Sequence, residues 1–213
     1  MKAICAGMAL VLVLAAAGCW LQKEPAPPVT YHLPSYEAPE PSERPALAAE
    51  IRVKRLSVSP AFDTRFMVYH KENGAWGQYP YHLWRAEPGM LVADYLARDL
   101  SKTGWFALAA NPGEGVDARF SLEGVVREFY ENDEPGGWKA VLVLDLALLD
   151  RRAPDVPGRV LFQNTYQYSC PARKKAPSAV ARAMGDCLRR ASARVMDDIY
   201  AAIARRLDAK SKE

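Results

Sequence analysis

The second half of the sequence constrains the fold most, because three strand-like runs are followed by one long amphipathic pattern. Residues 118–127 and 160–168 alternate apolar with polar side chains, which is typical of strands with one buried face. Between them, residues 140–149 are apolar on both faces except at Asp145, as expected for a central strand. Loops that contain Pro and Gly separate the three runs. This order predicts an antiparallel meander.

The amphipathic pattern at residues 178–207 predicts a long helix. Its apolar residues recur at helical spacing and form a single stripe, which consists of Val180, Met184, Leu188, Ala191, Val195, Ile199 and Ile203. Such a stripe usually packs on a sheet, and a helix face that meets a partner is the alternative.

The first half of the chain predicts shorter strands and a second helix. Residues 51–58 and 65–69 are strand-like, and 78–84 form an irregular or edge strand, because Pro80 cannot donate a hydrogen bond to a neighbouring strand. A helical pattern then runs from residue 88 to a glycine at 104, which suits a C-terminal cap. The sequence therefore predicts an α/β (α+β) fold: a mainly antiparallel sheet flanked by two helices, in a single compact domain over residues 51–208.

The first nineteen residues have the features of an export signal. Lys2 precedes an apolar run over residues 3–17, which ends in small residues and Gly18-Cys19. This ending resembles the bacterial lipobox, in which the cysteine receives a diacylglyceryl group and an acyl chain such as palmitate. We therefore expect a signal peptide over residues 1–18 and lipidation of Cys19. An uncleaved membrane anchor and cleavage without lipidation are the alternatives.

Residues 19–50 are expected to form a tether between the lipid and the domain. Seven prolines fall among Glu, Ser and Ala in this segment, a composition that favours extended polyproline II structure over a packed fold. At about 3.1 Å per residue, such a tether would reach roughly 90 Å. Trp20 stands where an aspartate would signal retention in the inner membrane, so a periplasmic protein anchored in the outer membrane is favoured over one in the inner membrane.

Cysteines, charge and motifs limit the chemistry that the chain can perform. Cys170 and Cys187 remain after export into an oxidising compartment, so a disulfide between them is expected, with two buried thiols as the alternative. The net charge of +3 and the absence of basic runs argue against nucleic-acid binding. No metal-ligand spacing, phosphate loop, dinucleotide fingerprint or catalytic motif occurs. We therefore expect no metal, no cofactor and no enzymatic activity.

Aromatic residues are concentrated between positions 69 and 84, in a segment that also carries Gly, Pro and Asn. Interfaces favour Tyr and Trp, because their rings bury a large area and keep a polar group. Cross-strand stacking within one hairpin is an equal alternative. The candidates for partner binding are Tyr69, Trp76, Tyr79 and Tyr81; Trp84, just before the helix, suits a packing role.

With its elements in this order, the chain resembles the ABC-type transport auxiliary lipoproteins of the paraquat-inducible-operon type. The resemblance covers about residues 50–205. The matching segments are Val53-Lys54-Arg55-Leu56, Pro60-Ala61-Phe62-Asp63, Met67-Val68-Tyr69, the Trp-containing run 83–88, the first helix around 96–100 and the strand at 122–129. The longer loop at 71–82 and the pair of cysteines depart from the pattern.

The resemblance implies a role beside an ABC permease and ATPase and an MCE-domain (mammalian cell entry) protein. Such systems move phospholipid or other hydrophobic molecules between the two membranes, and the family supplies no catalytic residues. A homo-oligomer is left open. Two other functions compete with this one: a periplasmic lipoprotein that itself binds a small hydrophobic ligand, and an assembly factor for an outer-membrane protein. A deep apolar cavity between the sheet and the 178–207 helix would favour the ligand binder.

Overall fold

The computed structural model describes residues 25–210, so the expected signal peptide and Cys19 lie outside the described residues. A mixed sheet and helices make up this part of the chain. The strands are β1 (Thr30–His32), β2 (Leu47–Val53), β3 (Ser57–Val58), β4 (Phe66–His70), β5 (Trp76–Trp84), β6 (Phe106–Ala110), β7 (Phe120–Glu134), β8 (Gly137–Asp150) and β9 (Val160–Pro171). The helices are α2 (Pro88–Lys102), α3 (Val156–Arg159) and α4 (Pro177–Lys210).

Strand β7 is the centre of the sheet. One of its edges pairs antiparallel with β8, which pairs antiparallel with β9, so the predicted meander is confirmed. The other edge pairs in parallel with β2, β3 and β4 at successive positions. Strand β6 lies beyond β2, while β5 and then β1 extend the sheet beyond β4. The long ladders are antiparallel as predicted, and the parallel attachment of the short strands is an addition to that prediction.

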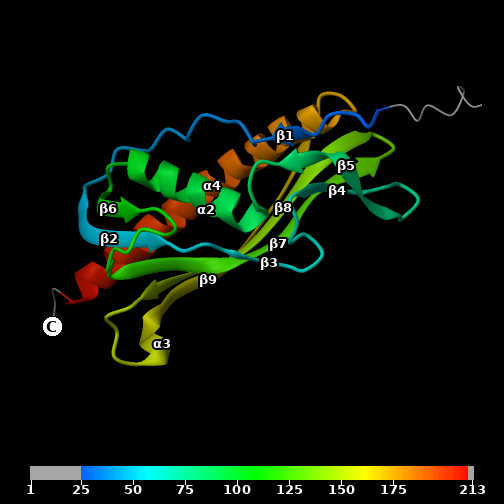
Figure 1. The fold of residues 1–213 in the computed structure, drawn as a ribbon. Coiled ribbons are helices and arrows are strands. Elements are labelled where there is room, and N and C mark those ends of the chain that lie inside the picture. The colour runs from blue at the N-terminus through cyan, green and yellow to red at the C-terminus, as the bar shows by residue number, and fades with distance from the viewer. Residues whose placement is uncertain (1–24, 211–213) are drawn as a thin grey trace, which may run out of the picture.

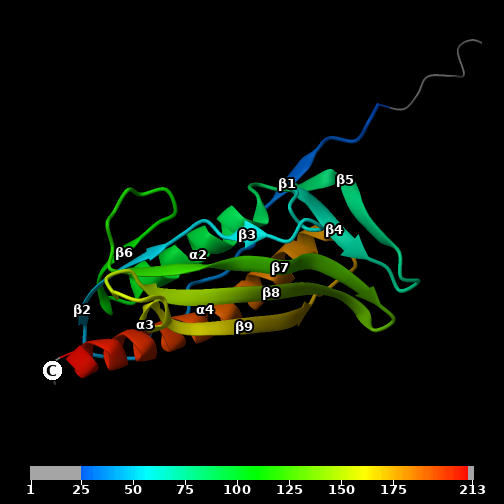
Figure 2. The ribbon, with the colours of Figure 1, turned by 90° about the horizontal axis from the view of Figure 1, so that it is seen from below.

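Both long helices cover the same face of the sheet, and Figures 1 and 2 show the opposite face without a helix of that length. The core forms between these layers. From β8, Leu142, Leu144, Leu146 and Leu148 are at most 1% exposed, and they point toward the helices. All seven residues of the predicted stripe on α4 are buried. The prediction that this stripe packs on the sheet is therefore confirmed.

A covalent bond and an ion network fix α4 to the sheet. Cys170 of β9 is bonded to Cys187 of α4, with their Cα atoms 5.7 Å apart, so the predicted disulfide is confirmed. Farther along, the carboxylate of Asp150, at the end of β8, is fully buried and accepts hydrogen bonds from Arg119 and Arg206 at 2.9 Å. Burial alone would raise the pKa of Asp150, but these hydrogen bonds hold it well below its usual range.

Residues 30–50, expected in the free tether, instead belong to the folded domain. Strand β1 pairs with β5, and β2 begins at Leu47 and not at residue 51. Between them, residues 33–46, here called the strap, run across the outer side of α2 and α4 (Figure 1). The strap forms a third layer over the helices, so the domain starts about twenty residues earlier than its expected boundary.

The strap is held by polar contacts from the two long helices and from the loop that follows α2. The hydroxyl of Tyr36 donates to the buried carboxylate of Asp99 at 2.7 Å, which also accepts from Ser192 of α4 at 2.6 Å. Arg44 forms an ion pair with Asp197 at 2.6 Å. Backbone carbonyls of the strap accept hydrogen bonds from the side chains of Tyr95, Trp105 and Tyr200.

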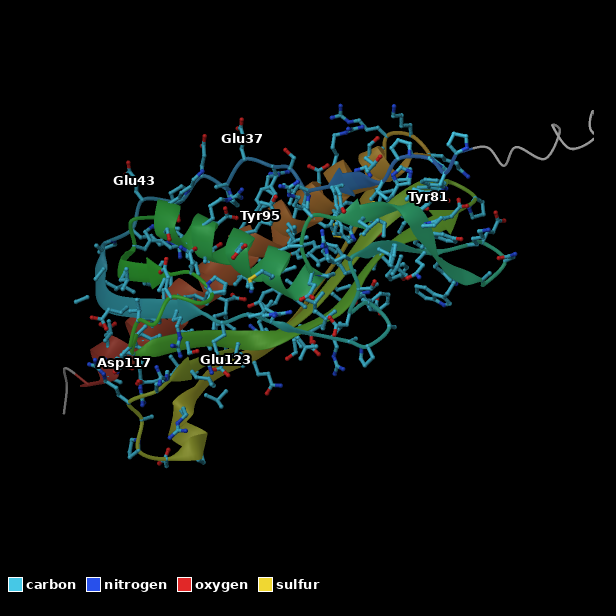
Figure 3. All side chains as sticks on the ribbon, in the orientation of Figure 1. Glu37, Glu43, Tyr81, Tyr95, Asp117 and Glu123 are labelled. Atoms are coloured by element: carbon cyan, nitrogen blue, oxygen red, sulfur yellow. A yellow bond between two sulfur atoms is a disulfide. The ribbon has the colours of Figure 1, made fainter. Side chains whose placement is uncertain are left out.

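The physical reason for this correction lies in the backbone of a proline-rich segment. An extended chain of this kind has no internal hydrogen bonds, so its carbonyls are free to accept from neighbouring side chains. Gly185 of α4 also lets the strap approach the helix closely. A Cβ at this position would lie 2.5 Å from the carbonyl oxygen of Ser35. Composition correctly indicated an extended segment but did not reveal the surface that binds it. Glu37 and Glu43 of the strap point away from the helices (Figure 3).

Candidate partner-docking site

The predicted aromatic cluster lies at one end of the sheet, on the β4–β5 hairpin beside the β7–β8 hairpin. In the β4–β5 ladder, Tyr69 pairs with Gly77 and His70 pairs with Trp76. Neighbouring positions along a strand point to opposite faces. The structure therefore divides the candidates: Tyr69 lies on one face and Trp76 on the other.

On the helix-bearing face, Tyr69 and Tyr79 form a small pocket with β7 and β8. Their ring centroids are 4.8 Å apart, and Tyr69 lies over Gly77, where a Cβ would be 2.5 Å from its ring. The pocket has a volume of about 280 Å³. It is lined by Tyr69, Lys71, Gln78, Tyr79, Pro80, Glu131, Asp133 and Trp138.

A buried carboxyl group forms the floor of this pocket. Glu131 is only 2% exposed, and it accepts a hydrogen bond from the hydroxyl of Tyr79 at 2.9 Å. Burial raises the pKa of Glu131 to about 7, although the Tyr79 hydroxyl acts in the opposite direction. Burial, and then the charge of Glu131, raises the pKa of Tyr79. The pair ties β5 to β7 and makes Tyr79 a structural part of this end.

On the open face, Trp76 rests on a group of rings but stays accessible. It is 55% exposed, although its ring centroid lies 4.5 Å from His70, 4.8 Å from Tyr130 and 5.9 Å from Phe62. Phe62 and Tyr130 stack on each other at 5.5 Å. A large aromatic ring that is already held in place loses little conformational freedom on binding, which is what an interface anchor requires.

Tyr81 and Trp84 also differ in their exposure to solvent. Tyr81 is partly exposed on β5 at this end of the molecule (Figure 3). Trp84 is 2% exposed and packs edge-on against Phe129 at 5.0 Å, which confirms its packing role. Each interpretation of the cluster thus applies to some of its members. Tyr69, Tyr79 and Trp84 pack against other rings on the helix-bearing face, whereas Trp76 remains accessible for an interface.

Sequence reasoning missed Phe62, Tyr130 and Glu131, which complete the two faces of this end. Tyr130 and Glu131 are neighbours on β7, so they point to opposite faces. An acid within the aromatic run Glu128-Phe129-Tyr130-Glu131 was the signal that could have marked them. Within residues 25–210, no group of three or more His, Cys, Asp or Glu side chains is arranged to hold a metal. In the same range, no helix is long and apolar enough to cross a membrane.

The comparisons with known proteins fit this architecture. A family model for the ABC-type transport auxiliary lipoprotein component matches residues 31–196, a range that begins within β1 and includes the strap. The chain therefore belongs to this family, which is an envelope lipoprotein family serving ABC-type transport.

Solved structures share the fold. A protein from Xanthomonas campestris is 19% identical, with a TM-score of 0.70, covering 85% of this chain and 99% of that one. An uncharacterised protein is 15% identical at a TM-score of 0.59, covering 76% and 99%. A hypothetical protein from Chlamydia trachomatis is 7% identical at a TM-score of 0.50, covering 74% and 98%. At these identities the likeness concerns the fold alone. No curated protein matches the sequence.

The raised pKa of Glu131 predicts a specific pH dependence of stability. Because its pKa is near 7 when folded and near 4.5 when unfolded, the folded state binds more protons between these values. Its contribution to stability is therefore fully present below pH 4.5 and is lost as the pH rises through 7. Relative to Glu131→Gln, which cannot ionise, the wild type should lose about 2 kcal/mol of unfolding free energy between pH 5 and 8.

Urea denaturation of both proteins at the two pH values measures this difference. The Tyr79→Phe variant is the control, because it removes the hydroxyl that favours the ionised carboxylate, so its pH dependence should be at least as steep as that of the wild type. Parallel pH profiles for wild type and Glu131→Gln would show that Glu131 is ionised throughout this range.

Proposed function

We propose that this protein is the non-catalytic accessory component of an ABC transport system with an MCE-domain partner, which moves phospholipid or another hydrophobic molecule between the two membranes. Membership of the auxiliary lipoprotein family supports the connection to an ABC transporter. The observation that carries the docking role is Trp76, a half-exposed indole held on the rings of His70, Tyr130 and Phe62. In this proposal Trp76 is the anchor for the partner, Tyr81 is a further contact on the same strand, and Tyr69 and Tyr79 support the hairpin.

The packing between the sheet and α4 argues against the ligand-binding alternative. The β8 leucines that face α4 are 0–1% exposed, and on the helix Met184, Leu188 and Val195 are equally buried. Side chains from both layers fill this space, so it offers no room for a hydrophobic ligand. The filled core does not distinguish the transport accessory from an assembly factor, since both need a docking surface. Only the identity of the bound partner distinguishes it.

We further propose that residues 1–18 are removed on export and that a lipid on Cys19 holds the domain in the periplasm, on the outer membrane. The linker to β1 is then much shorter than a free tether up to residue 50. Ten residues, from Trp20 to Val29, lead from the lipidated cysteine to the start of β1. At about 3.1 to 3.5 Å per residue, they reach roughly 30 to 35 Å.

Truncating the exposed indole should weaken partner binding without loss of stability. Trp76→Ala is expected to lower affinity for the MCE-domain partner by about 2 kcal/mol, or roughly 30-fold, as for an interface anchor. Its melting temperature should stay close to that of the wild type, because half of the side chain is already in water. The measurement is binding of the purified partner, followed in parallel with thermal melts.

Two variants control this experiment. Leu108→Ala removes another large exposed side chain, 39% accessible, at the opposite end of the sheet on β6, and should leave binding unchanged. Trp84→Ala removes a buried ring and should lower the melting temperature. Tyr79→Ala is no clean test, because it also breaks the hydrogen bond to Glu131. Wild-type affinity in the folded Trp76→Ala variant would exclude Trp76 from the interface.

Lipidation is tested at the N-terminus of the mature protein. We expect mass spectrometry to find a mature chain that begins at Cys19 and carries acyl chains. Cys19→Ser should accumulate as an unlipidated precursor, because a hydroxyl group cannot form the required thioether. A mature peptide that begins before residue 19 would contradict the proposal.

A further inference from the structure

Strand β1 exposes an unusual amount of apolar surface. Val29, Tyr31 and Leu33 are 48%, 51% and 49% exposed, and they belong to a small group of large apolar side chains that remain this accessible in residues 25–210. Tyr31 lies in the strand, and Val29 and Leu33 flank it directly. In an extended chain these three alternate with Thr30 and His32 and point to the same side. The other side of the strand faces the protein, where a nitrogen of His32 lies 3.1 Å from a nitrogen of His82.

This face is held rigidly and continues the open face of the sheet. Tyr31 pairs with Leu83, and Leu83 pairs with Phe66 of β4. The backbone of Arg85 donates to the carbonyl of His32 at 2.9 Å, just beyond the ladder. Paired residues in neighbouring strands point to the same side. Tyr31 and its two neighbours are thus presented as part of a fixed surface and not as a free chain end.

We propose that this face of β1 rests on the anionic phospholipid surface of the membrane that holds the lipid of Cys19. The inference depends on the lipid anchor proposed above and adds a contact surface to it. The length of chain between Cys19 and the domain supports this contact. The ten residues from Trp20 to Val29 keep β1 within roughly 35 Å of the membrane surface, so β1 is the first element of the domain that the anchor brings to the lipid.

The charges beside β1 are complementary to an anionic surface. The guanidinium of Arg65 lies over the ring of Tyr31 at 5.5 Å, and Arg65 and Arg85 are both exposed. An apolar strand edged by arginines and a tyrosine suits the boundary between headgroups and acyl chains. Cations near an anionic membrane surface add electrostatic attraction to the burial of apolar side chains.

A basic cleft lies directly beyond this strand. Two residues after Leu33, Ser35 lines a cleft of about 440 Å³ between the strap, the end of β9 and α4. Arg173, Arg182 and Arg190 line the same cleft, with Asp186 as its acidic residue. Lys174, in the same loop as Arg173, is exposed as well. The excess of positive charge in this cleft can receive phosphate headgroups near the membrane surface.

Depth-dependent quenching tests the contact in the full lipidated protein. Cys170 and Cys187 are bonded and Cys19 is blocked, so a cysteine introduced by Leu33→Cys can be labelled alone with an environment-sensitive dye. Leu108→Cys, on β6 at the opposite end, is the matched control. Both proteins are reconstituted with vesicles of phosphatidylethanolamine and phosphatidylglycerol that contain nitroxide-labelled lipid, and flotation is measured on the same samples.

The account predicts that both proteins float and that quenching at position 33 is several-fold stronger than at position 108. It should fall in vesicles of phosphatidylcholine alone, and also when Val29→Ser and Tyr31→Ser are combined with the label at 33. Equal quenching at the two positions would overturn the inference while leaving the anchor intact. A dye that is shielded from water but not quenched by the labelled lipid would mean that a protein surface, such as that of a second copy, covers β1. This result would also overturn the inference. Loss of flotation would remove the anchor and the inference together.

Discussion

The ladder between β7 and β8, with its apolar face buried under the helices, is the constraint on which the rest of the domain depends. Fourteen residue pairs join these two strands, and the side chains of β8 that face the helices are almost completely buried. Gly124 permits part of this contact, since a Cβ there would lie 2.1 Å from the carbonyl oxygen of Asp145. A bulge follows between Val126 and Glu128, and bulges bend and twist a strand. The outer edge of β7 then accepts three short strands in succession.

This arrangement determines where the two ends of the molecule lie. Because β4 pairs with the far end of β7, the β4–β5 hairpin and its aromatic side chains lie beside the β7–β8 hairpin. Strand β1 adds to β5, and the strap then crosses both helices to reach β2 at the other end (Figure 1). The N-terminal side of the domain therefore lies at the same end as Trp76. If Cys19 is lipidated as proposed, a partner that bound Trp76 would sit at the end of the domain that is nearest the anchor.

Periodicity was sufficient to predict the large elements, and insufficient for the small ones. The alternation in β7 and β9, the apolar β8 and the stripe on α4 each fix which face is buried, so the meander and its helix follow from them. Gly104, with a φ of 66°, ends α2 as its place in the pattern predicted. Strands β1 and β6 are only three and five residues long, and their stability comes from distant pairing partners. A local sequence pattern does not indicate a pairing partner that is distant in the sequence, and the strap was therefore predicted as a free tether.

The candidate site shows the same division. Aromatic enrichment predicted where the site lies. The sequence alone could not show that Tyr79 is hydrogen-bonded to Glu131 and that Trp76 is exposed to solvent. The face to which each ring points depends on the register of the hairpin. The disulfide was predictable, since an even pair of cysteines remains after export into an oxidising compartment. The acid beside Tyr130 could mark this end of the strand, but it could not show that Glu131 is buried, because that depends on Tyr79 and the other pocket residues that the fold places around it.

The claim that most depends on the fold is that β1 and the strap are part of the domain, which in the proposed arrangement limits its distance from the membrane. Hydrogen exchange of the membrane-anchored protein measures this directly. The account predicts slow exchange for the amides of β1 that bond to β5 and for Leu47, whose amide donates to the carbonyl of Trp105 at 2.7 Å. Gly185→Leu, which pushes against Ser35, should speed exchange in residues 30–46. If the β1 amides of the unaltered protein exchange as fast as an unfolded chain, the strap is free and the account is wrong.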